Sequence, residues 1–314
     1  MNKKKKHVPT HFWKRAWADC LAILRPIQIF DYLIPRWMNH RLSEWVGGYL
    51  IFGLMSQTRR KLKLNLQILG EGHFSRKQIH QLARETIQNY GKYLIDYLYF
   101  PTLSQKNISR LIQSSLGNEH LTTALQKKTG AILLSPHLGH WELGGIYLAT
   151  QGYPLTVISL RTGDREIAEY RDQVRMTHGI RVLYLDPQES PMQSALTMVS
   201  ALRNGEVLAM LGDRATGAEK IAVELFHRKY WFPSGPYLLS LITQTPLIPA
   251  FVVLEGLSYK LILEEPFMVE HQRGKNREVI LAEAASKMAM IFEKYIRRYP
   301  NQWYNWYPTW DSEK

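Results

Sequence analysis

Short apolar runs alternate with amphipathic segments through the second half of the chain. The runs cover residues 131–135, 155–160, 180–185, 206–211 and 247–254, and their length is typical of buried strands. Helical patterns fill several of the intervals: one helix is expected to start near Asp164 and to stop at Gly179, and Ser190 with Pro191 begins another. This alternation predicts an α/β fold with a central, mostly parallel sheet flanked by crossover helices.

The first third of the chain is predicted to be helical. Ser75 and Gln78 have the spacing of a capping box, and apolar residues follow at helical intervals through residues 79–98. A final helix is expected at residues 277–298, before Pro300 and an aromatic tail. No internal repeat interrupts this organisation.

Composition bounds the class of protein. A chain of 314 residues with 45% apolar residues can bury a substantial core, which excludes a mostly disordered protein. The one cysteine, Cys20, excludes an intramolecular disulfide framework and a zinc site built from several cysteines, and it is compatible with a reducing compartment. No secretory signal peptide is expected, because the basic start at Met1–Lys6 leads into a polar, aromatic stretch.

Positive charge is concentrated at the start of the chain. Of a net charge of +13, residues 1–65 contribute +10, from thirteen Lys or Arg against Asp19, Asp31 and Glu44. Such an asymmetry favours an anionic partner, which could be a membrane surface, nucleic acid or an acidic protein. The alternative is a solvated basic tail at Lys3–Lys6.

Aromatic residues interleaved with the basic ones favour the membrane among these partners. They are Trp13, Trp17, Phe30, Tyr32, Trp37, Trp45, Tyr49 and Phe52. Neither apolar group, at 21–34 or 46–55, provides the roughly 20 uninterrupted residues that a span needs. We therefore predict a peripheral or monotopic membrane-associating region at 1–65, followed by a single domain at 66–314, with the two folding as one cooperative unit.

The strongest candidate chemistry follows the run at 131–135. His137 and Glu142 stand five residues apart in a predicted strand-to-helix turn. There the carboxylate can accept one imidazole N–H while the other ring nitrogen takes a proton from a hydroxyl, which is general-base chemistry. The pair could instead be structural, with His137 capping a helix and Glu142 in its first turn. His140 adds a metal site as a minor alternative, although H-x-x-H-x-E matches no zinc signature.

Further candidates lie beside later elements. Arg175 can recognise phosphate or carboxylate, or simply favour the end of its helix. Asp213 and Arg214 follow the strand at 206–211, at the edge where open α/β sheets bind ligands, although they could pair with each other. Gly235 stands in a Gly/Pro-rich helix start that could also be a binding loop. The sequence has no Gly-x-Ser-x-Gly elbow and no phosphate loop ending in Lys-Ser/Thr, which favours direct transfer over a covalent intermediate.

Taken together, these residues resemble the bacterial lipid A late acyltransferases, the lauroyl and myristoyl transferases within the lysophospholipid acyltransferase superfamily. The resemblance extends from about Trp45 to Trp310, and its strongest part is His137 with Glu142, matching the family's H-x4-D/E motif. Supporting elements are Arg59-Arg60 with Asn65-Leu66, Arg175 with Gly179, Gly212-Asp213-Arg214, residues 226–236, Pro246-Leu247-Ile248-Pro249 and Pro300-Asn301-Gln302-Trp303. The ordered series is far more specific than any single motif.

The resemblance implies transfer of a fatty acyl chain from an acyl-carrier-protein thioester to a hydroxyl of a lipid A precursor at the cytoplasmic face of the bacterial inner membrane. His137 would be the general base and Glu142 its orienting partner, while backbone N–H groups or Arg175 would stabilise the oxyanion. The residues expected to bind substrate are Arg175, Asp213, Arg214 and Gly235. No cofactor or metal is expected besides the thioester co-substrate.

Alternatives remain at this stage. Similar motifs serve phosphatidylinositol mannoside or lysolipid acceptors and acyl-CoA donors, so another glycolipid or lysophospholipid acceptor and a CoA thioester stay open. A noncatalytic lipid-binding protein would share the membrane features but transfer no acyl group. A basic nucleic-acid-binding protein is the remote alternative, and nucleic acid is not expected as a partner because no nucleic-acid-binding motif is present in the sequence.

Overall fold

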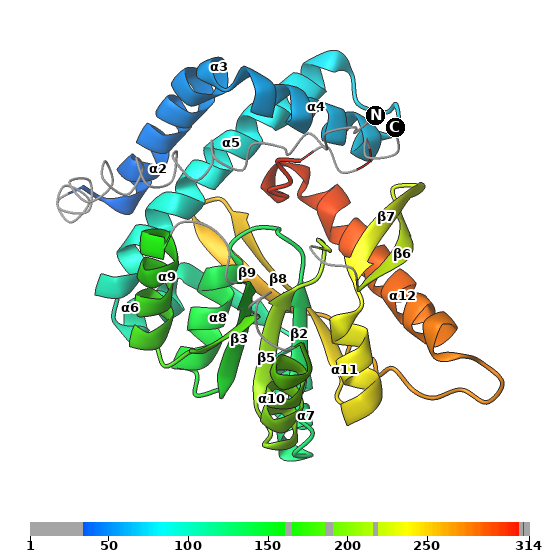
Figure 1. Cartoon of the computed structure of the whole chain (residues 1–314). Coiled ribbons are helices and arrows are strands. Elements are labelled where there is room, and N and C mark those ends of the chain that lie inside the picture. The colour runs from blue at the N-terminus through cyan, green and yellow to red at the C-terminus, as the bar shows by residue number, and fades with distance from the viewer. Residues whose placement is uncertain (1–33, 161–164, 186–190, 216–218, 308–309, 311–314) are drawn as a thin grey trace, which may run out of the picture.

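The computed structural model describes residues 34–310 except 161–164, 186–190, 216–218 and 308–309 (Figure 1). Expectations about Cys20, Lys3–Lys6 and the aromatic residues before position 34 fall outside these residues, as do those about Asp164 and Ser190. A seven-stranded sheet forms the centre of the described chain, with helices on both faces and a group of helices across one end.

The central sheet has the strand order β1-β9-β8-β2-β5-β3-β4. Its members are β1 (Ile112–Leu116), β2 (Ala131–Ser135), β3 (Leu155–Leu160), β4 (Arg181–Leu185), β5 (Val207–Leu211), β8 (Leu247–Glu255) and β9 (Ser258–Leu263). Neighbours β8-β2-β5-β3-β4 run parallel, whereas β9 is antiparallel to β8 and β1 is parallel to β9. The predicted α/β fold with a mostly parallel sheet is confirmed, and each predicted strand is present.

The hydrophobic pattern did not reveal β1, β9 or a hairpin outside the main sheet. β1 reads Ile-Gln-Ser-Ser-Leu, which is too polar to be recognised as a strand. The hairpin consists of β6 (Lys220–Leu225) and β7 (Arg228–Pro233), and its turn residues Phe226 and His227 both have positive φ. Such turns favour Asn-Gly or Gly, so a Phe-His turn carries no local sequence signal.

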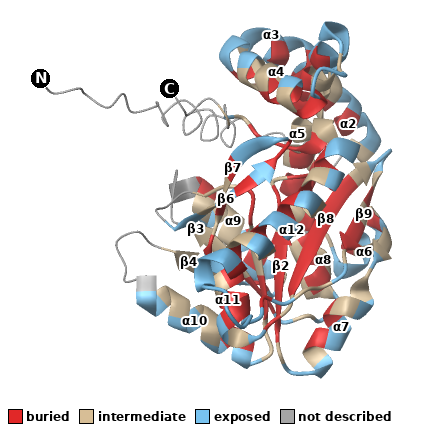
Figure 2. Cartoon of the chain, turned by 90° about the vertical axis from the view of Figure 1, so that its right-hand side faces the viewer, coloured by how far each residue is buried: buried red, intermediate tan, exposed pale blue. Residues whose placement is uncertain are grey.

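Helices cover both faces of the sheet (Figures 1 and 2). One face carries α6 (Gln105–Leu111), α7 (Asn118–Gln126), α8 (Trp141–Thr150) and α9 (Arg165–Thr177), and the other carries α10 (Pro191–Arg203), α11 (Gly235–Thr243) and α12 (Arg277–Arg298). Because side chains alternate along β2, Leu133 packs in the core beneath α6–α9 and Ile132 packs in the core beneath α10–α12. The predicted final helix matches α12, and Gly179, at φ +77°, follows the end of α9 as predicted.

A group of helices lies across the end of the sheet where the parallel strands stop (Figure 1). It comprises α2 (Arg36–Trp45), the π-helix η1 (Val46–Ile51), α3 (Phe52–Leu54), α4 (Ser56–Gly70) and α5 (Arg76–Tyr99). The predicted capping box is confirmed, since Ser75 Oγ accepts the Gln78 N–H and Gln78 Oε1 accepts the Ser75 N–H. α4 runs across position 65, where the predicted membrane-associating region ends. No helix of the described chain is long and apolar enough to cross a membrane.

One buried carboxylate fastens these helices to the sheet. Asp96 of α5 accepts two hydrogen bonds from Arg36 of α2 at 2.7 Å each, one from His40 at 2.9 Å and one from the Tyr259 hydroxyl of β9 at 2.6 Å. Burial alone would raise the pKa of Asp96, but Arg36 and His40 outweigh it and hold that pKa well below its usual range. Asp96 therefore stays ionised and links α2, α5 and β9.

We predict that Asp96→Asn lowers the free energy of unfolding by about 3 kcal/mol, because it leaves Arg36 without its buried counter-charge. The depressed pKa means that this stabilisation is fully present above the unfolded-state value of roughly 4 and is lost as the pH falls through the folded value. Chemical denaturation at several pH values measures both effects. Glu283→Gln is the control: it removes an exposed pair with Lys275 and should cost less than about 1 kcal/mol.

Candidate active site

The loop between β2 and α8 carries His137 and is held by its backbone. Gly139 adopts φ +64°, and a Cβ there would lie 1.9 Å from the Val252 carbonyl oxygen, so only glycine fits. The Gly139 N–H donates to Gln302 O at 2.9 Å, and the His140 N–H donates to Val252 O at 2.7 Å. The loop is thereby fixed between β8 and the segment of residues 302–307 after α12, which is called the C-terminal segment below.

Asp213, rather than Glu142, is the hydrogen-bond partner of His137. The imidazole Nδ1 lies 2.6 Å from Asp213 Oδ1, and the His137 backbone N–H donates to Oδ2 at 3.0 Å. Sheet register explains the meeting, because β2 and β5 are parallel neighbours with Ser135 opposite Leu211. The loops that follow these two residues leave the same edge side by side.

Asp213 is fully buried and stays ionised. Burial alone would raise its pKa, but His137, Arg214 and the indole of Trp303, which donates to Oδ2 at 3.0 Å, hold that pKa well below its usual range. An ionised carboxylate can only accept hydrogen bonds, so Nδ1 of His137 carries a proton. The other ring nitrogen, Nε2, is then the free base.

His137 presents this base to a cavity. Its side chain is 19% exposed and lines the cavity, and Nε2 makes no hydrogen bond within the described residues. Burial lowers the pKa of His137 and Arg214 lowers it further, while Asp213 offsets only part of the change. The imidazole is consequently neutral at pH 7 and able to accept a proton.

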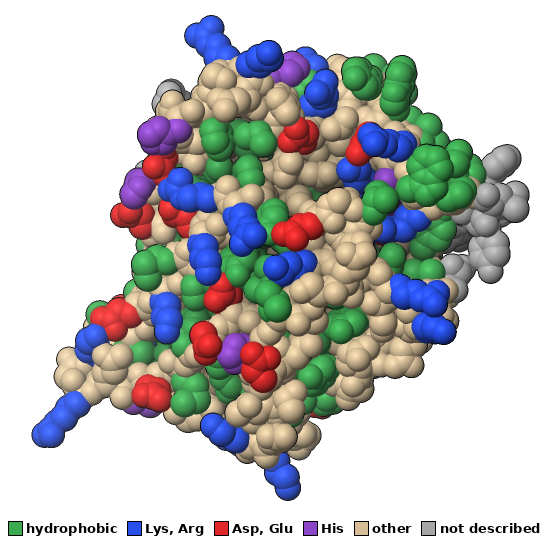
Figure 3. All heavy atoms as spheres, turned by 180° about the vertical axis from the view of Figure 1, so that it is seen from behind, with side chains coloured by type: hydrophobic (Ala, Val, Ile, Leu, Met, Phe, Trp, Pro, Cys, Tyr) green, Lys and Arg blue, Asp and Glu red, His purple; other side chains and the backbone are tan. Residues whose placement is uncertain are grey.

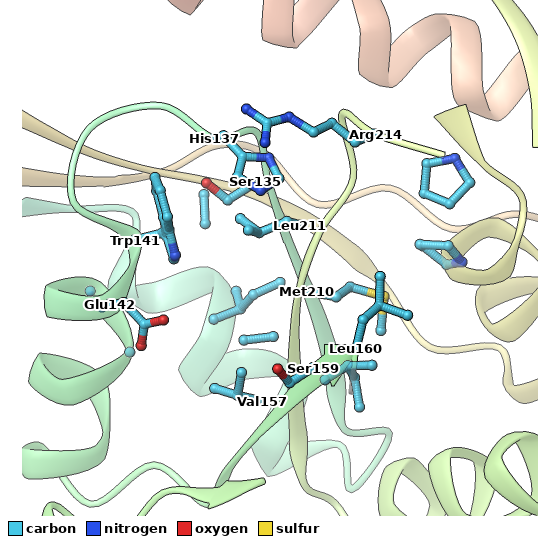
Figure 4. A pocket seen from close by; sticks show the side chains of 18 of the residues that line it. Ser135, His137, Trp141, Glu142, Val157, Ser159, Leu160, Met210, Leu211 and Arg214 are labelled. Carbon is cyan, nitrogen blue, oxygen red and sulfur yellow. The ribbon is translucent and has the colours of Figure 1, made fainter. Parts of the chain in front are cut away.

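The cavity has a volume of about 1000 Å³ and lies along the ends of the parallel strands (Figure 4). Its side between α8 and the sheet is apolar, lined by Leu133, Gly145, Leu148, Val157, Ile180, Ala209 and Ala250. Its side towards the β6–β7 hairpin and the C-terminal segment is polar and aromatic, lined by Arg214, Lys220, Tyr230, Trp231, Asn305, Trp306 and Tyr307. A long apolar group and a polar head group can therefore be accommodated in one site.

Glu142 pairs with Arg175 instead of His137. Its two oxygens accept from Arg175 at 2.5 and 3.0 Å, and both side chains are buried. Figure 4 shows Glu142 farther down α8, with Trp141 between its carboxylate and the His137 ring. The predicted His137–Glu142 hydrogen bond is therefore wrong, because α8 begins at Trp141 and directs residue 142 towards α9 while the loop directs His137 towards the end of β5.

Arg175 and Gly235 line the same cavity from α9 and α11. Besides Glu142, the Arg175 guanidinium lies 3.5 Å from Asp172, so its charge is already compensated. A Cβ added at Gly235 would meet no atom within 4 Å, so packing does not require glycine there. The structure brings these predicted residues to the cavity, and substrate binding by them stays a prediction.

Arg214 lies beside His137 at the cavity (Figure 4). Its guanidinium donates to Tyr304 O and has its Cζ 5.7 Å from the centre of the Tyr307 ring. The Arg214 Nε is buried with no hydrogen-bond partner among the described residues. Because Arg214 lines the cavity, its positive charge lies where an anionic group could bind.

His140 caps a helix within an aromatic cluster. Its Nδ1 accepts the Leu143 N–H at 3.4 Å, and its ring centre lies 4.2 Å from that of Tyr93. Burial lowers the pKa of His140 to about 4, so the ring is neutral. Within the described chain, no group of three or more His, Cys, Asp or Glu side chains is placed to hold a metal ion.

Residue chemistry alone did not single out Trp303 and Tyr304 as parts of this site. Tyr304 N–H donates to His137 O at 2.9 Å, and Trp303 contacts Asp213 across 90 residues of sequence. A tryptophan in an aromatic tail predicts packing, not a polar contact. The sole available signal was the family-like run Pro300–Trp303, which assigned the segment no role.

Comparisons with known proteins indicate the family of this chain. A family model described as bacterial lipid A biosynthesis acyltransferase matches residues 5–311. The phosphatidylinositol mannoside acyltransferase of Mycobacterium tuberculosis (strain H37Rv) is 24% identical over 226 residues, which cover 72% of this chain and 69% of that protein. The protein of the same name from Mycolicibacterium smegmatis is 24% identical over 236 residues, covering 74% of this chain and 73% of that protein.

We predict that Glu142→Gln lowers the free energy of unfolding by about 3–5 kcal/mol, because it strands a buried Arg175 charge. It should leave the pH at which His137 titrates unchanged, since Glu142 does not contact that ring. Asp213→Asn should lower the pKa of His137, because Asp213 is the group that raises it. Chemical denaturation and histidine NMR titration measure the two effects. If Glu142→Gln/Arg175→Met regains stability, the unpaired Arg175 charge causes the loss of stability in Glu142→Gln. Wild-type stability in Glu142→Gln would refute this explanation.

Proposed function

Because the chain belongs to the bacterial lipid A biosynthesis acyltransferase family, we propose that it moves a fatty acyl chain from a thioester to a hydroxyl of a membrane glycolipid, with His137 as general base and Asp213 as its orienting carboxylate. Family and relatives identify it as an O-acyltransferase. The observation that carries the assignment of roles is the 2.6 Å contact between His137 Nδ1 and Asp213 Oδ1, in a histidine that lines the cavity.

The reaction follows from this geometry. The acceptor hydroxyl gives its proton to His137 Nε2 while its oxygen bonds to the thioester carbonyl carbon, and the carbonyl π electrons move onto oxygen. Ionised Asp213 stabilises the imidazolium and keeps the ring oriented. The intermediate then collapses, the C–S bond breaks, and the departing thiolate takes the proton from Nε2. Ester and thiol are the products, and the neutral base is restored.

We propose that Arg214 binds negative charge near the reacting atoms. It lies beside His137 and lines the cavity without a carboxylate partner among the ion pairs of the described residues, whereas Arg175 is paired with Glu142 and Asp172. A cation in a partly buried site stabilises a developing oxyanion or a substrate phosphate more strongly than one in water. Arg175 instead maintains the wall of the cavity.

The apolar side of the cavity is proposed to hold the acyl chain. It lies between α8 and the sheet, where Gly145 lines it without a side chain, and a Cβ added there would lie 3.3 Å from Leu155 and 3.8 Å from Ile180. Burying each methylene contributes roughly 0.8 kcal/mol, so a long chain would be bound mainly by this side. The polar and aromatic side, including Trp231 and Tyr307, is then left for the acceptor head group.

The acceptor we favour is a lipid A precursor, and the donor an acyl-carrier-protein thioester. The family description supports the acceptor, and the basic excess of residues 1–65 suits both an anionic phosphoglycolipid and an acidic carrier protein. A second candidate, a phosphatidylinositol mannoside-type acceptor, is favoured by the names of the relatives at 24% identity. An acyl-CoA donor is the corresponding alternative.

An exposed apolar face on α2, η1 and α3 supports peripheral membrane association, which we propose to take place at the cytoplasmic face of the inner membrane. Its residues are Trp37, Met38, Leu42, Trp45, Val46, Tyr49, Leu50, Ile51 and Leu54, all exposed by more than a third. Figure 3 shows hydrophobic side chains with interspersed Lys and Arg at the upper right, where α2 and α3 lie in that view. A lipid surface would cover this face while the basic residues meet anionic head groups.

We predict that His137→Ala lowers the rate of acyl transfer by roughly 10²–10⁴-fold, because it removes the general base. Asp213→Asn should lose activity of similar order, because the imidazolium loses its stabilising partner. Mass spectrometry of lipid A precursor and of phosphatidylinositol mannoside, each with acyl-carrier-protein and CoA thioesters, detects the mass gain of one acyl group.

His120→Ala is the matched control in this assay, since His120 pairs with the exposed Glu265 away from the cavity. It should retain wild-type activity. Product formed at the wild-type rate by His137→Ala would refute the assigned base. Lipid binding without any product from the folded wild type would instead support a noncatalytic lipid-binding protein.

We predict that Trp45→Glu/Leu54→Glu weakens binding to vesicles of anionic phospholipid by more than about tenfold, because burial of each side chain contributes roughly 1.5–3 kcal/mol. Both residues are more than 70% exposed, so the fold should be unaffected. Met290→Glu, on α12 and 67% exposed, is the control and should bind as wild type does. Equal binding by both variants in vesicle sedimentation would exclude this face, and preferential binding to DNA would favour the nucleic-acid alternative.

A further inference from the structure

The carboxylate of Asp213 accepts three hydrogen bonds, and one of them comes from the far end of the chain. Two come from His137, through the backbone N–H at 3.0 Å and ring Nδ1 at 2.6 Å. The third comes from the indole Nε1 of Trp303 at 3.0 Å. Trp303 is 3% exposed and Asp213 is 0% exposed, so bulk water does not compete for this contact.

The main chain around Trp303 also pairs with the His137 loop. The Tyr304 N–H donates to His137 O, and the Gly139 N–H donates to Gln302 O, both at 2.9 Å. Between these two contacts, Leu138 and Trp303 form an antiparallel bridge. The segment 302–304 therefore lies along the loop like an added strand, and the Trp303 side chain reaches Asp213 from there.

Side chains at both ends hold this segment in place. Gln302 donates to the carbonyl of Leu254 and accepts its N–H, both at 2.8 Å, which fixes the segment to the end of β8. Asn65 of α4 donates to Asn305 O at 3.0 Å and to Tyr307 O at 2.7 Å. The position of the Trp303 indole is consequently determined by the sheet on one side and by the N-terminal helices on the other.

We propose that Trp303 is a positioning residue for acyl transfer, whose indole N–H holds the Asp213 carboxylate in the orientation that His137 requires. The proposal rests on the proposed function, in which Asp213 orients the base. Trp310 offers a comparison: its ring centre lies 6.1 Å from that of Trp303, yet its Nε1 is buried without a hydrogen-bond partner among the described residues. Packing in this aromatic cluster therefore does not depend on indole donation, whereas Asp213 uses the donor that Trp303 provides.

Loss of the Trp303 N–H has two physical consequences. The carboxylate keeps only its contacts to His137 and can rotate about its side-chain bonds, so the ring is held less firmly. Its negative charge is also less satisfied, which favours the imidazolium and raises the pKa of His137. The other charged or titratable groups near the pair are Arg214 and Tyr230, and the substitution changes neither.

The test compares Trp303→Phe with Trp310→Phe. Both variants remove an indole from the same cluster, but only the first removes a hydrogen bond that is used. For Trp303→Phe we expect kcat to fall about tenfold or more with KM little changed, as for loss of a hydrogen bond to a charged group. The acidic limb of kcat/KM and the NMR titration of His137 should both move to higher pH. Trp310→Phe should match wild type in kcat, KM and titration.

Two results would overturn the proposal: wild-type kcat and His137 titration in Trp303→Phe, or equal changes in both variants, which would identify packing as the cause. If Trp303→Phe does not fold, the benzothienyl analogue of tryptophan at position 303 keeps the bicyclic shape with sulfur in place of N–H, and the same outcomes apply. Failure of wild-type transfer with every donor and acceptor would count against the proposed function alone, because the NMR titration needs no substrate.

Discussion

The proposed reaction centre depends on one ionised carboxylate held away from water. A lone buried carboxylate would be strongly unfavourable, so the fold must surround Asp213 with donors and positive charge. His137 provides two of its hydrogen bonds, Trp303 provides the third, and Arg214 lies close by. These groups come from the loop after β2, the loop after β5 and the C-terminal segment. Satisfying one charge therefore brings together every segment that the proposed chemistry needs.

The same principle recurs at two other buried acids. Glu142 is matched by Arg175 in the wall of the cavity, and Asp96 is matched by Arg36 between the helical group and β9. Buried pairs of this kind add little net stability, because desolvation offsets much of their attraction. They do make alternative packings unfavourable, since a displaced partner would leave a charge unpaired. The first pair thus links α8 to α9, and the second links α2 to α5.

Asp213 and Glu142 have different roles because they pair with different residues. The H-x4-E spacing places Glu142 near the His137 loop, the register of β2 with β5 adds Asp213, and the structure gives these two acids different contacts. Asp213 acts on His137, whose Nε2 stays open to the cavity, while Glu142 compensates Arg175 deeper along α8. The apolar side of the cavity can then lie next to Glu142 without exposing a free charge to it, because the pair is internally neutralised.

Local sequence was sufficient wherever a residue's conformation depends on its neighbours in the chain. The apolar runs gave β2, β3, β4, β5 and β8, and the Ser75 capping box gave the start of α5, because burial period and capping are short-range properties. The candidate base, His137, was also found locally, from a histidine placed after an apolar run. The hairpin at β6 and β7 was missed because its turn has no Asn or Gly.

Only the tertiary structure decided which acid serves His137 and what Trp303 does. Asp213 lies 76 residues from His137 in the sequence, and Trp303 lies 90 residues from Asp213. The order of residues in one chain does not tell which strands are neighbours in the sheet. The register of β2 with β5 and the return of the chain after α12 create those contacts. The sequence by itself thus determined the parallel strands β2, β3, β4, β5 and β8 and the candidate base, whereas strand order determined the hydrogen bonds that this candidate base makes, because such bonds require proximity in space and not along the chain.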